Sequence, residues 1–586
     1  MDFIFSTIGF LSLALHVFCQ WALGRAVVTF IVSTKEGRPN GFAVEYTSGL
    51  LTYLALLLLL KCLGVPWWLA CYAPYLLTLG SGRREYYRDL FVIHLPNTWN
   101  HVLWSLVQII IGMTLFDSLS GSIVTPWKNA YGDFPFHFGM ISSFALADAF
   151  PPEQFFYAGQ PLSYPFFINL WSASLWFWSP SYYFLSVIFL VQWVLLWEVF
   201  YQAVDGDSNT FIPWLLLLAG GTFSSLGENS GTMIGSGLSF TSFLTTIWVP
   251  QRSGVFGAAV ASVILQLFFH WHQSREERRP YLLIAGFLLG LSPLVHTHIC
   301  FIVGVFIFLN LLVYVVYDGA AFKDRLKQTS LFVGYALLSL HALPFLLGKQ
   351  SIMKLGGHGF FPDAIVSGDL FYSLVFQSIW PLLIAIALIW IGSQAHRQMI
   401  ILLLLVAFAW TVRVSVWEWD QIKFFVGLYI ILLSILATSY RQMRGYVLLL
   451  PPLLCIPSAY EVGKIVEEAP RSEIFSAQRV SDALKMREQL PKDAILLAAP
   501  DHNGAAILTG RTLYVGYDGW LWSHGINYQE RKKRIAHLSS ALVCTEAVCP
   551  NYLVWTDGEK RFWKRSLPSP MAQLKAVSPI LYEITE

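Results

Sequence analysis

The chain has 586 residues, of which 55% are hydrophobic, 16% are aromatic and only 13% are charged. This composition is typical of an integral membrane protein and excludes an ordinary soluble domain. The formal net charge is +2 and the basic residues stand in short, separate clusters, so the sequence has no polybasic face and we expect no nucleic-acid partner.

Apolar runs that could form helices follow one another along most of the chain. They cover residues 5–31, 47–63, 66–80, 99–118, 162–179, 181–203, 210–225, 236–249, 253–271, 281–297, 299–317, 329–347, 372–392, 398–413, 422–438 and 445–461. Several are shorter than the ~20 residues that cross a bilayer, so we predict roughly 14–16 transmembrane helices. The predicted fold class is an α-helical polytopic membrane protein, with N-terminal transmembrane helices in residues 1–95 and a transmembrane core in residues 96–465.

The sequence becomes polar after Lys464. Residues 473–489 have the spacing of an amphipathic helix, and residues 494–499 and 551–555 are short apolar strand candidates. We therefore predict a small C-terminal α/β domain in residues 466–586, which is long enough to have a core of its own.

The lysines and arginines between the apolar runs indicate the orientation in the membrane. They stand at residues 35–38, 83–88, 275–279, 323–327, 397 and 441–444. Because short cytoplasmic loops are rich in these residues, alternation of the runs places residues 119–161 and the C-terminal domain on the opposite side. We expect a bacterial inner (plasma) membrane protein with both of these segments extracytoplasmic, where Cys544 and Cys549 could form a disulfide.

Residues 119–161 form a polar and aromatic segment between two apolar runs, and they include Lys128, Asp133, His137 and Glu153. A connection of this length is uncommon unless it is functional or disordered, and this one is too aromatic for disorder. We interpret it as an active-site loop with Lys128 and Glu153 as substrate-binding candidates. The alternative is a surface-lying amphipathic element that caps the helix bundle.

Asp133 stands in the turn-forming context Tyr-Gly-Asp-Phe-Pro, which would hold its carboxylate just outside the membrane. A carboxylate in this place can accept a proton from a hydroxyl nucleophile or bind a divalent cation, whereas a plain helix cap is the alternative. His137 follows four residues later and lies on the same side if the segment is helical. It is either a catalytic partner of Asp133 or an interfacial histidine.

Three groups in the membrane core are candidates for binding a phosphate. Arg252 lies between two apolar runs, which is costly unless it has an anionic partner such as a lipid phosphate or extends to the surface. His296 and His298 occur in Pro-Leu-Val-His-Thr-His and could bind a phosphate oxygen or a metal. Hydrogen-bonded interface residues are the alternative for the two histidines.

Two aromatic and polar segments are candidates for binding substrate, and the first of them has the residue types of a sugar site. The first contains Trp417, Glu418, Trp419, Asp420 and Lys423. Indole rings cover the apolar faces of a sugar and carboxylates accept hydrogen bonds from its hydroxyls, although a tryptophan belt at the membrane surface is the alternative. The second, in the glycine-rich loops of the tail, contains His502, Arg511, Trp520, His524 and Arg531.

The Asp133 segment, Phe150-Pro-Pro-Glu153 and the Ala-Gly-x-x-Leu-x-Tyr run from Ala158 to Tyr164 resemble a large prokaryotic branch of the polyprenyl-phosphate-dependent membrane glycosyltransferases with the GT-C fold. The resemblance covers residues 95–535 in organisation. It implies that Asp133 is the catalytic or metal-linked acid, that Arg252 contacts the donor phosphate and that the C-terminal domain covers the acceptor. The chain lacks the Asp-Asp or Asp-x-Asp pair of some branches, so the cofactor is unknown, with Mg or Mn at Asp133 as the candidate.

The function that this resemblance implies is transfer of a sugar from a polyprenyl-phosphate donor to an extracytoplasmic glycan, lipid or protein acceptor. Asp133 would act as general base on the acceptor hydroxyl. A transporter or flippase of a lipid-linked saccharide is the second hypothesis, which Glu198 and the glycine-rich residues 219–239 favour. A noncatalytic envelope assembly protein is the third, and it predicts that Asp133→Asn leaves function intact.

Overall fold

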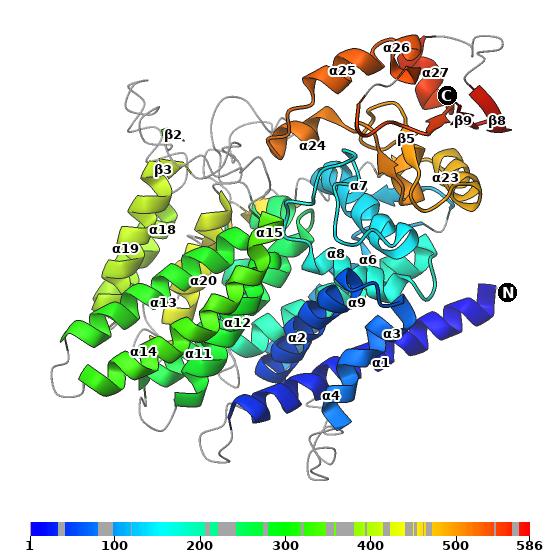
Figure 1. The fold of residues 1–586 in the computed structure, drawn as a ribbon. Coiled ribbons are helices and arrows are strands. Elements are labelled where there is room, and N and C mark those ends of the chain that lie inside the picture. Colours follow the sequence, from blue (N-terminus) through cyan, green and yellow to red (C-terminus); the bar gives the residue numbers. More distant parts are fainter. Residues whose placement is uncertain are drawn as a thin grey trace, which may run out of the picture.

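The computed structural model describes the chain in segments that together form a helical bundle and a mixed sheet unit (Figure 1). The described residues are 2–32, 41–79, 98–118, 120–204, 211–220, 242–273, 279–317, 322–346, 357–358, 380–392, 395–413, 422–439, 449–450, 454–456, 458–460, 462–463, 471–543, 546–564 and 574–585.

The bundle consists of helices that are apolar over most of their length. Its main helices are α1 (Asp2–Ile31), α2 (Phe42–Cys62), α6 (Trp99–Met113), α8 (Phe167–Trp176), α9 (Tyr182–Val204), α10 (Ile212–Leu217), α11 (Arg252–Gln273), α12 (Arg279–Leu291), α13 (Thr297–Tyr317), α14 (Phe322–Ala336), α15 (Leu343–Leu346), α18 (Trp380–Gly392), α19 (His396–Thr411) and α20 (Ile422–Ser439). Helix α11 lies at the centre and packs against α9, α12, α13 and α20.

Seven helices among the described residues are long and apolar enough to cross a membrane. They are Thr7–Ile31, Phe42–Cys62, Tyr182–Val204, Arg252–Gln273, Thr297–Val316, Phe322–Leu346 and Ile422–Ser439. Four apolar helices are shorter, at Trp99–Met113, Arg279–Leu294, Leu382–Gly392 and His396–Ala409. The protein is therefore a helical polytopic membrane protein, as predicted. The predicted number of 14–16 spans refers to the whole chain, so the seven helices of the described residues do not test it.

Three of the predicted apolar runs are not continuous spans in the described residues. Residues 66–80 form the short helices α3 (Trp67–Tyr72), η1 (Ala73–Tyr75) and α4 (Leu76–Leu79), and the run 162–179 contains only the ten-residue helix α8. In the run 236–249 the described helix is the π-helix η4 (Leu244–Trp248). All residues of α8 and η4 are buried, and apolar residues buried in protein have the same hydropathy as residues that face lipid.

The two N-terminal helices cross at glycines. A Cβ atom on Gly24 would lie 1.6 Å from the carbonyl oxygen of Glu45, and one on Gly49 would lie 1.8 Å from the carbonyl oxygen of Gln20. Small residues let transmembrane helices approach this closely. The crossing also places the Arg25 guanidinium 3.5 Å from the Glu45 carboxylate.

An ion pair between a buried lysine and a partly exposed aspartate attaches this N-terminal hairpin to the segment that follows α7 and η2. Lys61, in the last turn of α2, is buried and its Nζ atom lies 2.7 Å from the carboxylate of Asp148. The same amine donates to the carbonyl of Val65 at 2.8 Å and lies over the rings of Trp67 and Phe150. Because the lysine is desolvated, this contact fixes the position of the chain after Asp148.

Residues 119–161, expected to be a loop, contain the helix α7 (Lys128–Ser142), which the π-helix η2 (Ser143–Ala147) extends. A short strand, β1 (Ile123–Thr125), precedes them. Helix α7 contains Pro135, which cannot donate a backbone hydrogen bond, yet every residue from Phe134 to Ser142 is buried. Tertiary packing of this apolar face therefore outweighs the low helix propensity of its glycines and proline.

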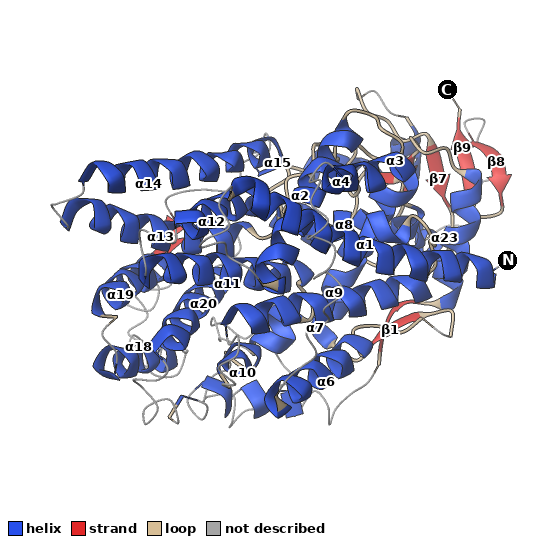
Figure 2. Cartoon of the chain, turned by 90° about the horizontal axis from the view of Figure 1, so that it is seen from below, coloured by secondary structure: helices blue, strands red, loops and turns tan. Residues whose placement is uncertain are grey.

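The residues after 471 form a five-stranded mixed sheet flanked by helices, at one end of the molecule (Figure 2). The strand order is β6 (Thr512–Leu513), β5 (Ile495–Leu497), β7 (Tyr552–Val554), β9 (Leu581–Ile584) and β8 (Leu574–Ser578). The helices are α23 (Ala477–Gln489), η9 (Ala505–Thr509), α24 (Asp518–Ser523), α25 (Gln529–Ile535), α26 (Leu538–Leu542) and α27 (Asp557–Trp563). The strand candidates at 494–499 and 551–555 are β5 and β7, whereas the predicted helix 473–489 begins with strand β4 (Ser472–Phe475).

Backbone hydrogen bonds connect this sheet unit to residues 119–161. Strand β4 pairs with β1 in antiparallel fashion, with Thr125 opposite Ser472. The amide of Leu513 donates to the carbonyl of Phe155 at 2.7 Å, and the amide of Ala158 donates to the carbonyl of Leu513 at 2.9 Å. Segments far apart in the sequence therefore form one continuous structure around α7.

Candidate functional site

Helix α7 places its polar side chains on different sides. Asp133 and His137 are four residues apart and share one face, as the sequence predicts for a helical segment. Tyr131 precedes Asp133 by two residues, which is about 200° around a helix, so it faces away from Asp133. Phe136, three residues after Asp133, lies beside it.

His137 belongs to a buried polar cluster at the centre of the bundle. Its Nδ1 atom lies 3.1 Å from Oδ1 of Asn169, and the same oxygen lies 3.5 Å from a nitrogen of Arg252. Arg252 also donates to Oγ of Ser172 at 2.6 Å and to the amide oxygen of Gln192. Helices α7, α8, α9 and α11 each contribute to this cluster, and all five side chains are buried.

The guanidinium of Arg252 is a buried charge held by neutral groups. Besides the three oxygen acceptors, the ring of Phe189 lies 3.4 Å from the central carbon of the guanidinium. In the part of the chain that the structure describes, no carboxylate lies within 4.0 Å of its nitrogens. Three of its five N–H groups are occupied, which leaves two for a further acceptor. A buried cation without an anion is costly and marks a functional site in membrane proteins.

His137 is neutral at neutral pH. Burial, followed by the positive charge of Arg252, lowers the pKa of His137 to about 3, although its bond to Asn169 acts in the opposite direction. The ring therefore acts as a neutral hydrogen-bonding link between α7 and the Arg252 cluster, because proton uptake would add a second charge in the same place.

The histidines of the membrane core lie near the same junction of helices. His296 is buried against α11, where a Cβ on Gly257 would lie 2.7 Å from its own Cβ. The ring of His298 lies 5.9 Å from that of His296 and 4.9 Å from that of Phe424 at the start of α20. Lys423 precedes Phe424, and its charge also lowers the pKa of His137. The structure thus brings Arg252, His137, His296, His298 and Lys423 to one region of the bundle.

Two of the predicted tail residues, Trp520 and His524, lie on the Asp133 side of α7. Their rings are 5.6 Å and 5.4 Å from the ring of Phe136. Tyr164 lies 5.7 Å from His524 and closes this group of rings. Trp520 is buried, whereas His524 and Tyr164 are partly exposed, so solvent reaches the group next to Asp133.

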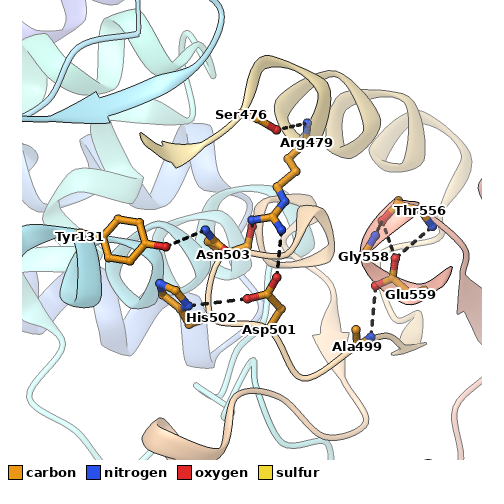
Figure 3. Close-up of polar contacts among 10 residues, drawn as sticks. All are labelled: Tyr131, Ser476, Arg479, Ala499, Asp501, His502, Asn503, Thr556, Gly558 and Glu559. Carbon is orange, nitrogen blue, oxygen red and sulfur yellow. Dashed lines mark hydrogen bonds and ion pairs between the residues drawn. The ribbon is translucent and has the colours of Figure 1, made fainter. Parts of the chain in front are cut away.

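His502 contacts α7 at Tyr131. Its ring is 4.9 Å from that of Tyr131, and the amide of Asn503 donates to the Tyr131 hydroxyl at 3.3 Å (Figure 3). Asp501 lies 3.6 Å from His502 and 3.0 Å from Arg479. Burial raises the pKa of Asp501, but the hydrogen bond with His502 and the charge of Arg479 outweigh it, so the net shift is downward. This network attaches the sheet unit to α7.

The two predicted arginines of the tail make structural contacts. Arg511 donates to the backbone carbonyls of Pro491, Thr509 and Leu490. Arg531 donates to the carbonyl of Ala158 at 2.9 Å and forms an ion pair with Glu546 at 3.0 Å. Their donors therefore hold the sheet unit together and attach it to residues 119–161.

The remaining predicted residues lie apart from the cluster or outside the described residues. Lys128 and Glu153 are exposed. Trp417, Glu418, Trp419 and Asp420 lie outside the described residues. Within the described segments no group of three or more His, Cys, Asp or Glu side chains could hold a metal ion.

No protein-family model matches the chain, and no curated protein matches it either. The argument for function therefore depends on the site itself.

The polar partners of Arg252 were not predicted from the sequence. Asn169, Ser172 and Gln192 are neutral residues within apolar runs, and such residues are common in membrane helices. Two features of the sequence could have indicated them. Asn169 and Ser172 are three residues apart and so share a helix face, and Arg252 required polar partners.

Proposed function

We propose that this chain is a membrane glycosyltransferase that moves a sugar from a polyprenyl-phosphate donor to an acceptor, with Asp133 as general base and Arg252 as the cation that binds the donor phosphate. The observation that carries this proposal is the buried guanidinium of Arg252, which has no carboxylate within 4.0 Å among the described residues. Arg252 is also the first residue of α11, where the helix dipole adds positive potential. A phosphate at this position would compensate the charge of the guanidinium and the positive potential of the helix.

Asp133 supports the proposal through its place on α7. It shares a face with His137, which is bonded to the Arg252 cluster through Asn169. Transfer from a lipid-phosphate sugar requires two groups. One is a carboxylate and the other is a cation that binds phosphate, and the two lie on neighbouring parts of one site. The resemblance of the Asp133 segment to GT-C glycosyltransferases is consistent with this assignment.

The proposed reaction is a displacement at the anomeric carbon of the donor sugar. The acceptor oxygen forms a bond to this carbon while the bond from the carbon to the phosphate oxygen breaks, and the electron pair leaves with the polyprenyl phosphate. Asp133 accepts the proton of the acceptor hydroxyl. Arg252 stabilises the negative charge that grows on the departing phosphate. The lipid of the donor enters sideways from the bilayer that surrounds the helices.

The site is proposed to face the extracytoplasmic side of a bacterial inner membrane. The basic clusters between the apolar runs support this orientation, because short cytoplasmic loops are enriched in lysine and arginine. Cys549, which is disulfide-bonded in the structure, also favours an oxidising compartment for the sheet unit. Cys544 lies outside the described residues.

A second candidate function is transport of a lipid-linked saccharide, which one observation favours. Nε2 of His101 on α6 lies 2.9 Å from each carboxylate oxygen of Glu198 on α9. Ionisable pairs within a helix bundle are typical of transport pathways. This candidate predicts movement of the saccharide across the bilayer without sugar transfer, and it assigns no role to Asp133.

The test is sugar transfer by purified protein in lipid nanodiscs. A panel of radiolabelled polyprenyl-phosphate hexoses and pentoses is offered with total envelope acceptors to the wild type, Asp133→Asn and Asp557→Asn. The last is a matched control, because Asp557 lies on the sheet unit with its side chain 80% exposed. We expect transfer by the wild type and the control and loss of transfer in Asp133→Asn. Absence of transfer from every donor, or equal transfer by all three proteins, refutes the proposal.

A further inference from the structure

The amide oxygen of Gln192 is an acceptor that two members of the Arg252 cluster share. Oε1 of Gln192 accepts a hydrogen bond from the guanidinium of Arg252, and Oγ of Ser172 lies 2.9 Å from the same oxygen. A guanidinium only donates, so the oxygen of the amide, and not its NH2 group, must face Arg252. Gln192 lies on α9 and Arg252 begins α11, and these two helices pack against each other. Gln192 therefore holds the guanidinium across a helix interface by an oxygen that carries no net charge.

Glutamine is less favourable for stability at position 192 than glutamate would be. Nε2 of Gln192 is buried and makes no hydrogen bond in the described part of the chain, and burying a donor in this way costs free energy. Arg252 is buried as well, and a buried charge without a counter-charge is more costly still. A carboxylate has the shape of the amide and accepts the same hydrogen bonds, but it has no NH2 group and would complete an ion pair. Both terms favour glutamate, so the amide indicates a requirement other than stability.

We propose that Gln192 is a positioning residue that holds Arg252 for the donor phosphate without compensating its charge. The amide oxygen fixes the guanidinium, and the neutrality of the amide adds no negative charge that would compete with a phosphate. Asn169 and Ser172 follow the same pattern, because their oxygens are also neutral. This inference rests on the proposed function and deepens it. The net positive charge of the cluster recognises the phosphate of the donor, rather than its polyprenyl chain or its sugar.

The test changes only the charge at position 192. Gln192→Glu keeps the shape of the side chain and the acceptor for Arg252 and Ser172, and it adds one negative charge. The matched control is Gln108→Glu on α6. Gln108 is also buried, but its amide oxygen accepts a hydrogen bond from the indole of Trp193 at 3.0 Å, which is a neutral donor. The same exchange therefore gives Arg252 a counter-charge at one position and buries a carboxylate beside a neutral group at the other.

The measurement is the Kd of the full-length protein in nanodiscs for a polyprenyl monophosphate. The uncharged polyprenol is the second probe, and the thermal midpoint is measured on the same preparations. For Gln192→Glu we expect the Kd for the polyprenyl phosphate to rise at least about tenfold, which is the effect of one charge on a neighbouring ionised group. Its Kd for polyprenol should not change, and its thermal midpoint should rise because the ion pair is complete. Gln108→Glu should bind both probes like the wild type and unfold at a lower temperature.

The other outcomes are distinguishable. A purely structural role for Gln192 predicts an unchanged Kd, because the variant keeps the hydrogen bonds. Gln192→Glu that binds the polyprenyl phosphate like the wild type therefore overturns the inference and leaves the proposed function intact. Weaker binding of both probes together with a lower midpoint also overturns it, since the change then distorts the site. A wild type that binds the polyprenyl phosphate no more tightly than polyprenol refutes the proposed function, and the inference with it.

Discussion

Replacing Arg252 by methionine separates a functional arginine from a structural one. Methionine keeps much of the length of the side chain and removes the charge and all donors. The change removes three charged hydrogen bonds, worth about 1.5–3 kcal/mol each, but it also removes the cost of burying an unpaired cation, which is several kcal/mol. Because the two terms are of similar size, we expect the free energy of unfolding to change by less than about 2 kcal/mol.

Arg511 is the matched control for this experiment, because it is also buried and also makes three hydrogen bonds. Its acceptors are backbone carbonyls; burial and then the charge of Arg487 lower the pKa of Arg511, and the charge of Asp493 opposes them only in part. Arg511→Met should therefore lower stability by about 3 kcal/mol or more, since three carbonyls lose their donors without a large gain in solvation.

The assay combines sugar transfer in nanodiscs with thermal unfolding of the same preparations. For Arg252→Met we expect kcat/KM to fall about 10²- to 10³-fold, the usual effect of losing one group that stabilises transition-state charge, with a nearly unchanged thermal midpoint. Arg511→Met should show the reverse, with normal activity per folded molecule. A fall in the midpoint of Arg252→Met as large as that of Arg511→Met would show that Arg252 is structural and would refute the reasoning.

Three further predictions concern stability. Gly24→Ala should lower the free energy of unfolding by at least about 3 kcal/mol, because its Cβ would lie 1.6 Å from a backbone oxygen of α2. Gly334→Ala has open space around the new Cβ and should leave the thermal midpoint unchanged or raise it. The pKa of His137 is about 3 in the folded protein and 6.5 in the unfolded chain, so acid favours the unfolded chain. The free energy of unfolding should therefore fall by about 2 kcal/mol between pH 7 and pH 5, and by less in His137→Gln. Parallel pH curves for the two proteins would contradict this. Lys61→Met should lower the thermal midpoint, because it leaves the Asp148 carboxylate without its partner. Adding Asp148→Asn removes that charge and should restore part of the midpoint. If the double variant shows no recovery, the ion pair does not contribute to stability.

The sequence predicted the helical membrane class because hydropathy depends only on composition along the chain. Hydropathy does not distinguish a helix that faces lipid from one that is buried by protein, as in α8, where all ten residues are buried. The sequence of residues 119–161 predicts a loop, because it is a polar and aromatic segment between two apolar runs and contains the turn-forming Tyr-Gly-Asp-Phe-Pro. Packing of the apolar face of α7 decided otherwise, and packing cannot be read from local propensity.

For the site, local spacing was informative and long-range contact was not. The four-residue spacing of Asp133 and His137 predicted a shared face, which α7 provides. The free-energy cost of a charge among apolar residues identified Arg252 as a candidate for binding an anion. The sequence could not show that Asn169 contacts both His137 and Arg252. Nor could it show that His502 meets Tyr131 or that His524 meets Phe136, because these contacts depend on how distant segments pack.

The pairing of β1 with β4 has a consequence for the synthesis of this protein. Thr125 and Ser472 lie about 350 residues apart, so at the usual 5–20 residues per second a ribosome needs roughly 20–70 s to produce the partner of β1. During that interval β1 has an open edge, which is a template for wrong pairing. A chain that terminates before Ser472 lacks the partner of β1 and keeps this edge unpaired.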